Sequence, residues 1–297
     1  MARVIVTGGT GLIGQELCKL LTEKGYSVAI ISRTKKTLSK YEVFHKSELS
    51  WALKDADYII HLAGAGIVDK AWTKKRKYII LKSRTSIVKK IYSHVSQEKN
   101  QLKAFISSSA IGYYGLKTTE TIYLEDDKPS NDFIGNTCRI WEEAVNEFNS
   151  LNIRTIKIRT GIVLSKTGGA LDKMSKPIKL GFGAALGSGN QYIPWIHIED
   201  LCNIYLQAIE NENMQGAYNA VTPEHITNTD FTKSIAQQLH KKIWLPNVPA
   251  FVLKIILGSR AQLVLKGSRI SSSKIISTGF KFKYTTVKAA LQNLFAN

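Results

Sequence analysis

The segment RVIVTGGTGLIG, residues 3–14, decides the fold of this chain. Four of its first five residues are β-branched, and they give way to glycines, which is typical of a buried parallel strand that ends in a turn. From Leu12 to Lys24 apolar side chains recur at helical spacing, and Gly25 ends the pattern. We therefore expect a strand, a glycine turn and a helix in immediate succession.

The glycines of this turn have the spacing G-x-x-G-x-x-G, which between a strand and a helix is typical of a dinucleotide-binding loop. Gly8 permits the tight turn, Gly11 lets the backbone approach a pyrophosphate, and Gly14 lets the helix pack closely on the strand. The N–H groups at the helix N-terminus then bind the phosphates. The predicted cofactor contacts in this loop are Gly8, Thr10, Gly11, Leu12, Ile13 and Gly14.

The end of the next predicted strand, residues 26–32, distinguishes between the two nicotinamide cofactors. An acidic residue there would bind the ribose 2′-hydroxyl of NAD. The chain has Ser32 and Arg33 instead, with Lys35 and Lys36 close behind. A hydroxyl and a guanidinium suit a 2′-phosphate, which an acid would repel. The sequence therefore favours NADP over NAD, although Arg33 also fits a surface charge on a loop.

Strands and helices alternate along the first half of the chain, which predicts an α/β fold with a doubly wound parallel sheet. The further strands are expected at residues 56–64, 103–109 and 153–165, and the helices at 73–95 and 132–149. After residue 166 the chain becomes rich in glycine and poor in clear elements, as in a loop-rich lobe that closes over a site.

We expect three parts. Residues 1–165 form the NADP-binding Rossmann domain, to which residues of about 195–220 return. Residues 166–245 form a substrate lobe, and residues 246–297 a C-terminal segment of unknown function. The two later parts together make a smaller α+β lobe.

Composition bears on the partners. The net charge is +18, but lysines outnumber arginines by 32 to 9 and are spread over many elements. Because specific phosphate recognition favours the arginine fork, we expect a solvated basic surface and no nucleic-acid partner. No apolar run approaches the roughly 20 residues that span a bilayer, so no membrane partner is expected. The three cysteines are far apart, the histidines are scattered and the N-terminus has no signal-peptide layout, which favours a reducing cytoplasm and no metal site.

Several motifs together resemble the extended short-chain dehydrogenase/reductases that epimerise or dehydrate nucleotide sugars. The segments that carry the resemblance are HLAGAGIVDKAWTKKRKYIILKSR (61–84), SSSAIGYYG (107–115), CRIWEEA (138–144), GIVLSKTGGAL (161–171) and LGSGNQYIPWIHIEDL (186–201). The chain is most similar to an atypical epimerase-family branch, whose C-terminal segment of unknown function is matched by VPAFVLKIILG (248–258) and STGFKFKYTTVKAAL (277–291). The resemblance implies an NADP-binding sheet and adds Leu62, Ala63, Gly64 and Arg84 to the expected cofactor contacts. It brings no substrate.

The same resemblance exposes a gap in the catalytic machinery. Active members pair a strand-end serine with Tyr-x-x-x-Lys on the next helix, where the lysine lowers the pKa of the phenol. Ser109 falls at the serine position. Phe133 or Ile134 stands where the tyrosine belongs, and Thr137 or Cys138 where the lysine belongs. Neither pair can transfer protons, so Tyr113 or Tyr114 is our candidate phenol beside Ser109, with plain aromatic packing as the alternative.

Other candidates depend on the resemblance alone. Lys82 and Arg84 lie on the helix that faces the cofactor in the wider superfamily, where they would bind a phosphate or a substrate carboxylate unless they are surface charges. Trp195 and His197 are expected to border the substrate pocket, and we expect His197 to tie its loop to Asp200. Arg159 is expected to be structural.

Two hypotheses for function follow. The first is an NADP-dependent oxidoreductase or epimerase-like enzyme that acts on a small polar substrate, with a nucleotide sugar as one candidate. The second is a non-catalytic NADP(H)-binding sensor, which the missing Tyr-x-x-x-Lys pair favours. The glycine- and aromatic-rich segment 187–200 favours the enzyme, because a sensor has no need of a substrate pocket. The sequence does not predict the oligomeric state.

Overall fold

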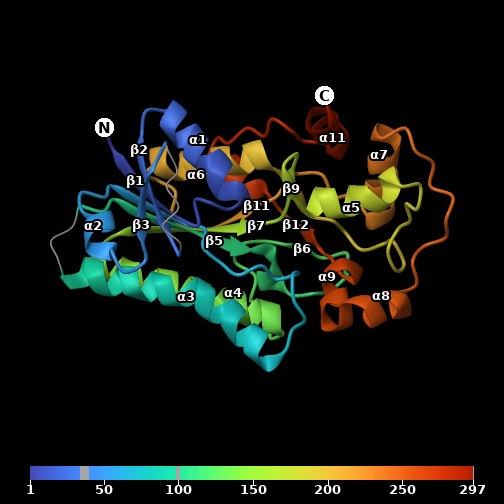
Figure 1. Cartoon of the computed structure of the whole chain (residues 1–297), viewed down its shortest axis with the longest axis horizontal. Coiled ribbons are helices and arrows are strands. Elements are labelled where there is room, and N and C mark those ends of the chain that lie inside the picture. The colour runs from blue at the N-terminus through green and yellow to red at the C-terminus, as the bar shows by residue number, and fades with distance from the viewer. Residues whose placement is uncertain (34–39, 98–100, 297) are drawn as a thin grey trace.

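The computed structural model describes residues 1–33, 40–97 and 101–296, and its centre is a seven-stranded parallel sheet (Figure 1). Across the sheet the strand order is β11-β7-β5-β4-β1-β2-β3. The strands are β1 (Arg3–Thr7), β2 (Ser27–Ser32), β3 (Glu42–His45), β4 (Tyr58–His61), β5 (Ala104–Ala110), β7 (Arg154–Thr160) and β11 (Gly216–Ala220). This is the predicted doubly wound arrangement, extended by one strand.

Helices cover both faces of the sheet, as Figure 1 shows. On one face α1 (Leu12–Glu23) and α6 (Ile198–Glu210) share a buried cluster with Val4 and Val6 of β1. On the other, α2 (Leu49–Leu53), α3 (Lys74–Gln97) and α4 (Phe133–Asn146) share a second cluster with Ile5. Successive β1 side chains thus enter opposite layers, as the period of two in a strand requires. Each such buried aliphatic side chain contributes about 1.5–3 kcal/mol.

Strand register brings four strand ends into one row. Thr7 of β1 pairs with Ile31 of β2 and His61 of β4, and His61 pairs with Ser107 of β5. One residue further on, Gly8, Ser32, Leu62 and Ser108 are therefore level at the carboxyl edge. The chain order reverses between β1 and β4, so this edge is the switch point where doubly wound sheets bind ligands.

The segment predicted as one strand, 153–165, is two strands on different sheets. The main-sheet strand β7 ends before Gly161, and β8 (Ile162–Ser165) pairs instead with β9 (Gly168–Gly169) and β10 (Trp195–His197). A Cβ at Gly161 would lie 2.8 Å from the Pro194 carbonyl oxygen and 2.8 Å from a Val221 methyl, so only glycine fits where the chain changes sheets.

A third buried cluster lies beyond this crossing. It joins β8 and β10 to α5 (Ala170–Lys179), α7 (Asn228–Gln238) and α11 (Val287–Phe295). Residues from both predicted later parts of the chain thus share one core, and the boundary near residue 246 stays a prediction. Among the described residues no helix is both long and apolar enough to cross a membrane.

Short elements complete the chain. The described elements not yet named are η1 (Ile111–Tyr114), β6 (Ile122–Tyr123), η2 (Glu147–Leu151), α8 (Ala250–Leu257), η3 (Gly258–Ala261), α9 (Gln262–Leu265), β12 (Arg269–Ile270) and α10 (Ser273–Ser277). The predicted helix 132–149 therefore ends at Asn146 and continues as a 3-10 turn, and the segment after Ala110, expected to be a loop, is also a 3-10 turn. The pattern reading did not predict β3 and α2, which are only four and five residues long.

Candidate cofactor and active site

The glycine turn is packed too closely for side chains. Gly8 has a φ of 77°, and its carbonyl oxygen accepts the N–H of Gly11 at 3.0 Å. A Cβ at Gly14 would lie 2.4 Å from that same oxygen, which holds the first turn of α1 directly against the end of β1. The structure thus shows the tight turn at Gly8 and the close helix–strand packing at Gly14, and the approach of a pyrophosphate to Gly11 stays a prediction.

The N-terminus of α1 presents its backbone amides at this edge. Its N-cap is Gly11, in an extended conformation, with no side chain capping the first turn. Thr10 and Gly11 are exposed, and Leu12 and Ile13 are half-buried. First-turn amides and the helix dipole favour an anionic group at this point.

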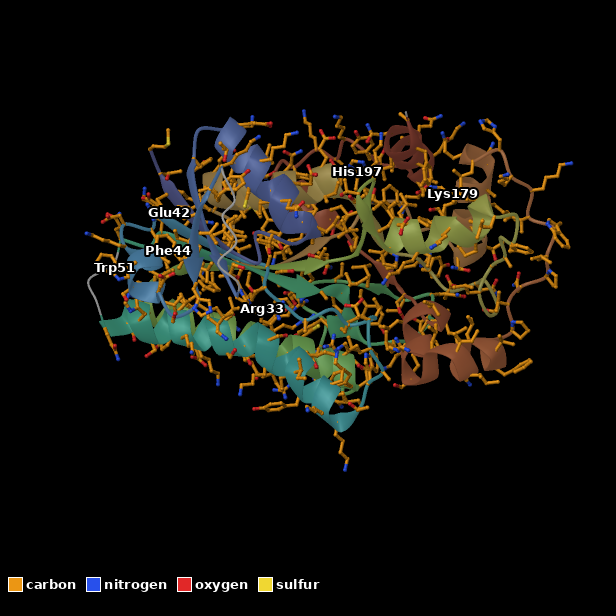
Figure 2. The ribbon with its side chains drawn as sticks, viewed as in Figure 1. Arg33, Glu42, Phe44, Trp51, Lys179 and His197 are labelled. Carbon is orange, nitrogen blue, oxygen red and sulfur yellow. The ribbon has the colours of Figure 1, made fainter. Side chains whose placement is uncertain are left out.

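Arg33 follows the end of β2 and is exposed (Figure 2). Ser32, the last residue of that strand, is half-buried and level with Gly8. Lys35 and Lys36, which were part of the prediction for the 2′-phosphate, lie outside the described residues.

The segment after β4 lies against the glycine turn. A Cβ at Gly8 would be 2.9 Å from the backbone nitrogen of Ala63 and 2.9 Å from the carbonyl carbon of Leu62, so these two residues border the loop, and Gly64 follows them in the chain. Beneath them the ring of His61 bonds through Nδ1 to Thr7 Oγ1 at 2.6 Å and through Nε2 to the backbone oxygen of Arg84 at 3.0 Å. The carbonyl must accept, so Nε2 carries the proton and Nδ1 accepts from Thr7. His61 thereby fixes α3 beside the predicted cofactor residues.

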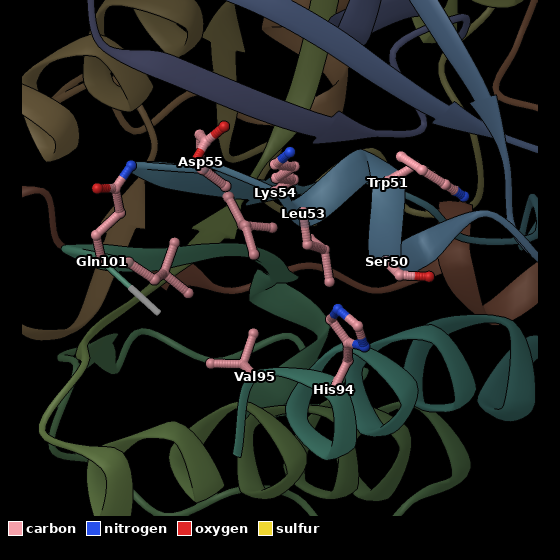
Figure 3. A pocket seen from close by; sticks show the side chains of 11 residues that line it. Ser50, Trp51, Leu53, Lys54, Asp55, His94, Val95 and Gln101 are labelled. Atoms are coloured by element: carbon pink, nitrogen blue, oxygen red, sulfur yellow. The ribbon is translucent and has the colours of Figure 1, made fainter. Parts of the chain in front are cut away.

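A cavity of about 660 Å³ lies at the other end of the sheet (Figure 3). It is lined by residues of α2, the last turns of α3 and the segments that lead into β4 and β5, including Trp51, Lys54, Asp55, His94 and Gln101. None of the predicted site residues lines it. Because ligands of doubly wound sheets bind at the carboxyl edge, we do not assign this cavity to the site.

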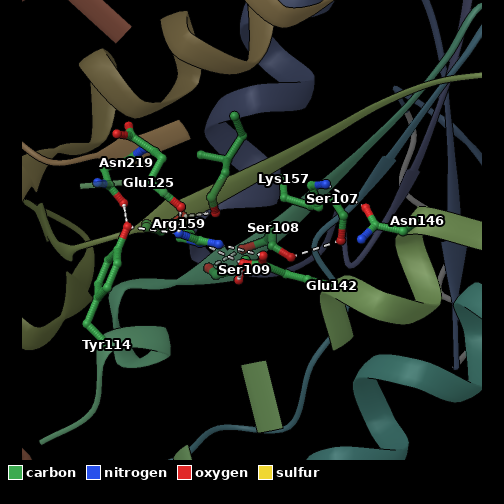
Figure 4. A network of polar contacts seen from close by, with 12 residues as sticks. Ser107, Ser108, Ser109, Tyr114, Glu125, Glu142, Asn146, Lys157, Arg159 and Asn219 are labelled. Carbon is green, nitrogen blue, oxygen red and sulfur yellow. Dashed lines mark hydrogen bonds and ion pairs between the residues drawn. The ribbon is translucent and has the colours of Figure 1, made fainter. Parts of the chain in front are cut away.

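Ser109 belongs to a buried network around Arg159 (Figure 4). Its hydroxyl donates to Glu142 Oε1 at 2.6 Å, and it is 2% exposed. Arg159 in β7 donates from Nε and Nη2 to the two oxygens of Glu142, both at 2.9 Å. Burial alone lowers the pKa of Arg159, but the hydrogen bonds and charge of Glu142 outweigh it and raise the pKa. Arg159 is therefore the structural residue that we expected, with a carboxylate among its partners.

The two candidate phenols differ sharply. Tyr114 is 2% exposed, donates to Asn219 Oδ1 at 2.7 Å and accepts from Arg159 Nη1 at 2.9 Å. Burial raises its pKa, against the opposing effect of Arg159. Tyr113 is half-buried, with the Arg159 guanidinium carbon 3.5 Å from its ring centroid. A buried phenol with both hydrogen bonds in use is poorly suited to proton transfer, which leaves Tyr113 as the better placed of the two.

The positions of the missing pair are filled by buried groups. Ile134 is 3% and Cys138 4% exposed, and a Cβ at Gly112 would meet Ile134 Cγ2 at 2.4 Å and Cys138 Sγ at 3.9 Å. Both side chains thus approach Gly112 of η1, and the choice between Phe133 and Ile134 and between Thr137 and Cys138 for the missing pair stays open. Burial raises the pKa of Cys138 to about 12, so its thiol stays protonated at neutral pH.

The structure corrects the expectations for Trp195 and His197. Trp195 is fully buried in the third core cluster, and His197 is 3% exposed, so neither borders an open pocket. His197 caps α6 by accepting the N–H of Glu199, and its Nε2 bonds to Asn293 Oδ1 at 3.1 Å. Asp200 is not its partner, because that carboxylate accepts the N–H groups of Lys283 and Tyr284.

Two further residues are Lys82, a predicted substrate contact whose role stays a prediction, and Glu142, which was not predicted from the sequence. Lys82 is exposed, and its ammonium lies 5.3 Å from the ring centroid of Tyr78, as in the surface-charge alternative. Glu142 was missed, although it lies one helical turn after Cys138 and so shares its face, a spacing that would have placed a carboxylate beside the strand-end serine. Among the described residues, no group of His, Cys, Asp or Glu side chains could hold a metal ion.

A parallel sheet in this order, with a glycine turn at its switch point, defines a Rossmann-type dinucleotide-binding fold. The chain belongs to the NAD dependent epimerase/dehydratase family, whose model matches residues 4–220. A domain of unknown function matches residues 248–294. The fold class and the family resemblance drawn from the sequence are thereby confirmed.

Relatives with known sequences or structures match along the whole chain. The epimerase family protein YfhF of Bacillus subtilis is 34% identical over 300 residues, which cover 99% of this chain and 98% of that protein. The crystal structure of the human epimerase family protein SDR39U1 (isoform 2) with NADPH has a TM-score of 0.90 at 30% identity and covers 98% of each chain. The UDP-glucose 4-epimerase of Thermus thermophilus in complex with NAD has a TM-score of 0.77 at 17% identity and covers 98% of each chain, which shows likeness of fold alone.

Substituting each of two adjacent glutamates on α4 tests how much the buried network contributes to stability. Glu142→Gln leaves the Arg159 charge buried without a counter-charge and should lower the free energy of unfolding by about 3–5 kcal/mol. Glu143 pairs with Arg139 at the surface, so Glu143→Gln should cost less than about 1 kcal/mol. Urea unfolding of both variants measures the difference, and equal losses would contradict the assignment.

Stability should also depend on pH through two histidines. Burial lowers the pKa of His61 and of His197 to about 4. Unfolded histidine takes up its proton below about pH 6.5, whereas these folded rings stay neutral down to about pH 4. Their contribution is therefore complete above about pH 6.5 and is lost as the pH falls toward 4, by roughly 3 kcal/mol for fully buried His61.

The corresponding experiment follows the free energy of unfolding from pH 7 to 4.5. The loss should be smaller in His61→Gln than in the parent protein, because the ring that resists protonation is gone. Exposed His240, replaced by Asn, serves as the control and should follow the parent. Parallel curves for His61→Gln and the parent would refute the explanation.

Proposed function

We propose that this chain binds NADP(H) at the carboxyl edge of its sheet and is an oxidoreductase or epimerase-like enzyme that acts on a small polar substrate. The observation that carries the proposal is the close packing of Gly14 on the Gly8 carbonyl, which leaves the α1 amides uncapped at the switch point. Leu62 and Ala63 border the same turn. These features support pyrophosphate binding there.

The preference for NADP rests on the end of β2. An exposed guanidinium at Arg33 suits a 2′-phosphate, whereas no acid follows Ser32 to bind a free 2′-hydroxyl. The human relative SDR39U1 was crystallised with NADPH. The three cysteines, all buried and unpaired, are consistent with the cytoplasmic location that we propose.

A bound nicotinamide supplies or accepts the hydride in such chemistry. The chain's own task is then to hold a substrate carbon against it and to move a proton. Tyr113 is our proton-transfer candidate, because its phenol is only half-buried and is the more accessible of the two. Burial raises the pKa of this phenol, and the Arg159 guanidinium over its ring opposes that rise. Ser109 holds Glu142 in place, and releasing its hydroxyl to a substrate would break a 2.6 Å hydrogen bond.

For the substrate class we propose a nucleotide sugar as the first candidate. Structural neighbours include UDP-glucose and UDP-glucuronic acid 4-epimerases, although these share less than 20% identity with this chain. A second function is favoured by Ile134 and Cys138, which replace the proton-transfer pair. The protein would then bind NADP(H) as a sensor without turnover.

Cofactor choice is the first test of the proposal. NADPH should bind at least about tenfold more tightly than NADH, because charge-assisted hydrogen bonds to a phosphate contribute about 1.5–3 kcal/mol. Arg33→Ala should remove most of that difference, and Arg139→Ala, which changes an arginine on α4, should not. Fluorescence titration measures both affinities, and equal binding of NADPH and NADH by the parent would refute the argument.

Turnover separates the two phenols. In a screen of sugar nucleotides and small carbonyls with NADPH, Tyr113→Phe should lower the rate on the best substrate at least about tenfold, as loss of a general acid does, with NADPH affinity unchanged. Tyr114→Phe should instead lower the free energy of unfolding by about 1–3 kcal/mol, since it leaves Arg159 and Asn219 short of a buried partner. An unchanged rate in Tyr113→Phe would eliminate that residue as the donor.

A further inference from the structure

Arg84 is a half-buried arginine whose donors are only partly used. Its Nη1 donates to the carbonyl oxygens of Ala65, at 3.1 Å, and Ile80, at 2.9 Å. A guanidinium has five N–H groups, and those on Nε and Nη2 have no acceptor among the described residues. The unused edge of the fork is therefore available to a ligand.

No carboxylate among the described residues balances this charge. The acid of the adjoining loop, Asp69, pairs with Lys173 at 3.7 Å. The second guanidinium nearby, that of Arg76, donates to the Gly66 carbonyl and has a buried Nε without a partner in the described chain. Burial, and more weakly the charge of Arg76, lowers the pKa of Arg84. Arg159 differs from Arg84 in this respect, because the carboxylate of Glu142 forms an ion pair with it at 2.9 Å.

The guanidinium of Arg84 lies beside Gly64, one of the predicted cofactor contacts. A Cβ at Gly64 would lie 3.3 Å from Arg84 Cζ and 3.4 Å from Nη2, so a side chain at this exposed position would crowd the guanidinium. The Arg84 charge opposes the rise in the pKa of Cys138 that burial causes, and Cys138 is one of the two residues predicted at the position of the missing lysine. The aromatic ring of Trp141 supports the guanidinium from 5.3 Å.

We propose that Arg84, assisted by Arg76, binds an anionic group of the substrate, a carboxylate or a phosphate, beside the nicotinamide end of the cofactor site. The inference rests on the proposed function and names the chemical class that the substrate must carry. A planar fork with two adjacent free donors matches either anion in a bidentate way.

The substrate is a better source of this anion than the cofactor, so the proposal replaces the expectation, drawn from the family resemblance, that Arg84 contacts the cofactor. The α1 amides are placed for the cofactor pyrophosphate, and Arg33 for its 2′-phosphate. Arg84 lies beyond the segment after β4, on the side of Cys138 and η1, where the strand-end serine and the candidate phenol are also found.

The experiment titrates inorganic phosphate and, separately, succinate into the whole protein, alone and saturated with NADPH, and follows binding by NMR. Arg84→Gln should weaken anion binding about tenfold or more, since it removes hydrogen bonds to a charged group. Arg84→Lys, which keeps a point charge but loses the fork, should fall between. The surface variant Arg139→Gln is the control and should bind both anions with the affinity of the parent. NADPH affinity should change less than about threefold in every variant, which corresponds to less than about 0.7 kcal/mol.

Two results would overturn the inference. One is unchanged anion affinity in Arg84→Gln or, should that variant not fold, in Arg84→Lys. The other is a parallel loss of anion and NADPH affinity, which would assign the anion to the cofactor. Failure of the parent to bind NADPH would refute the proposed function instead, and the titration without cofactor would still test Arg84.

Discussion

The carbonyl oxygen of Gly8 is the contact on which the carboxyl edge of the sheet depends. It accepts the N–H of Gly11, and a Cβ at Gly14 would lie 2.4 Å from it. Position 14, in the first turn of α1, therefore has no room for a residue other than glycine. Gly8 also packs against the backbone of Ala63, since a Cβ at Gly8 would lie 2.9 Å from the Ala63 nitrogen. This contact sets the distance between β1 and the segment after β4. The packing leaves the N-terminal amides of α1 without a side-chain cap at this edge, as the pyrophosphate site that we propose requires.

Two arginines near α4, one buried and one half-buried, have different partners. Arg159 is neutralised by Glu142, which also accepts the Ser109 hydroxyl, and Arg159 donates to Tyr114, so these four side chains form one buried network. Arg84 has carbonyl partners but no acid among the described residues. A partly buried charge without a counter-charge costs stability, and the anionic ligand that we propose for Arg84 would supply that counter-charge.

The sequence predicted what depends on local spacing. The glycine turn, its helix and most strands of the main sheet follow from patterns within about 20 residues. The break in the strand at Gly161 could not be predicted in this way, because the residues that crowd it, Pro194 and Val221, lie more than 30 residues further along the chain. The choice between Tyr113 and Tyr114 also depends on distant groups, since Asn219 and Arg159 hold the second phenol. The burial of Trp195 and His197 likewise follows from packing against the C-terminal segment, which no local pattern contains.

The central claim is that NADP(H) lies across the carboxyl edge between the glycine turn and Arg33. A crystal structure of the protein with NADPH tests it most directly. The account predicts the pyrophosphate at the N–H groups of residues 11–13 and the 2′-phosphate in contact with Arg33. A nucleotide bound elsewhere, or an adenosine ribose whose 2′-phosphate has no contact with Arg33, would contradict it.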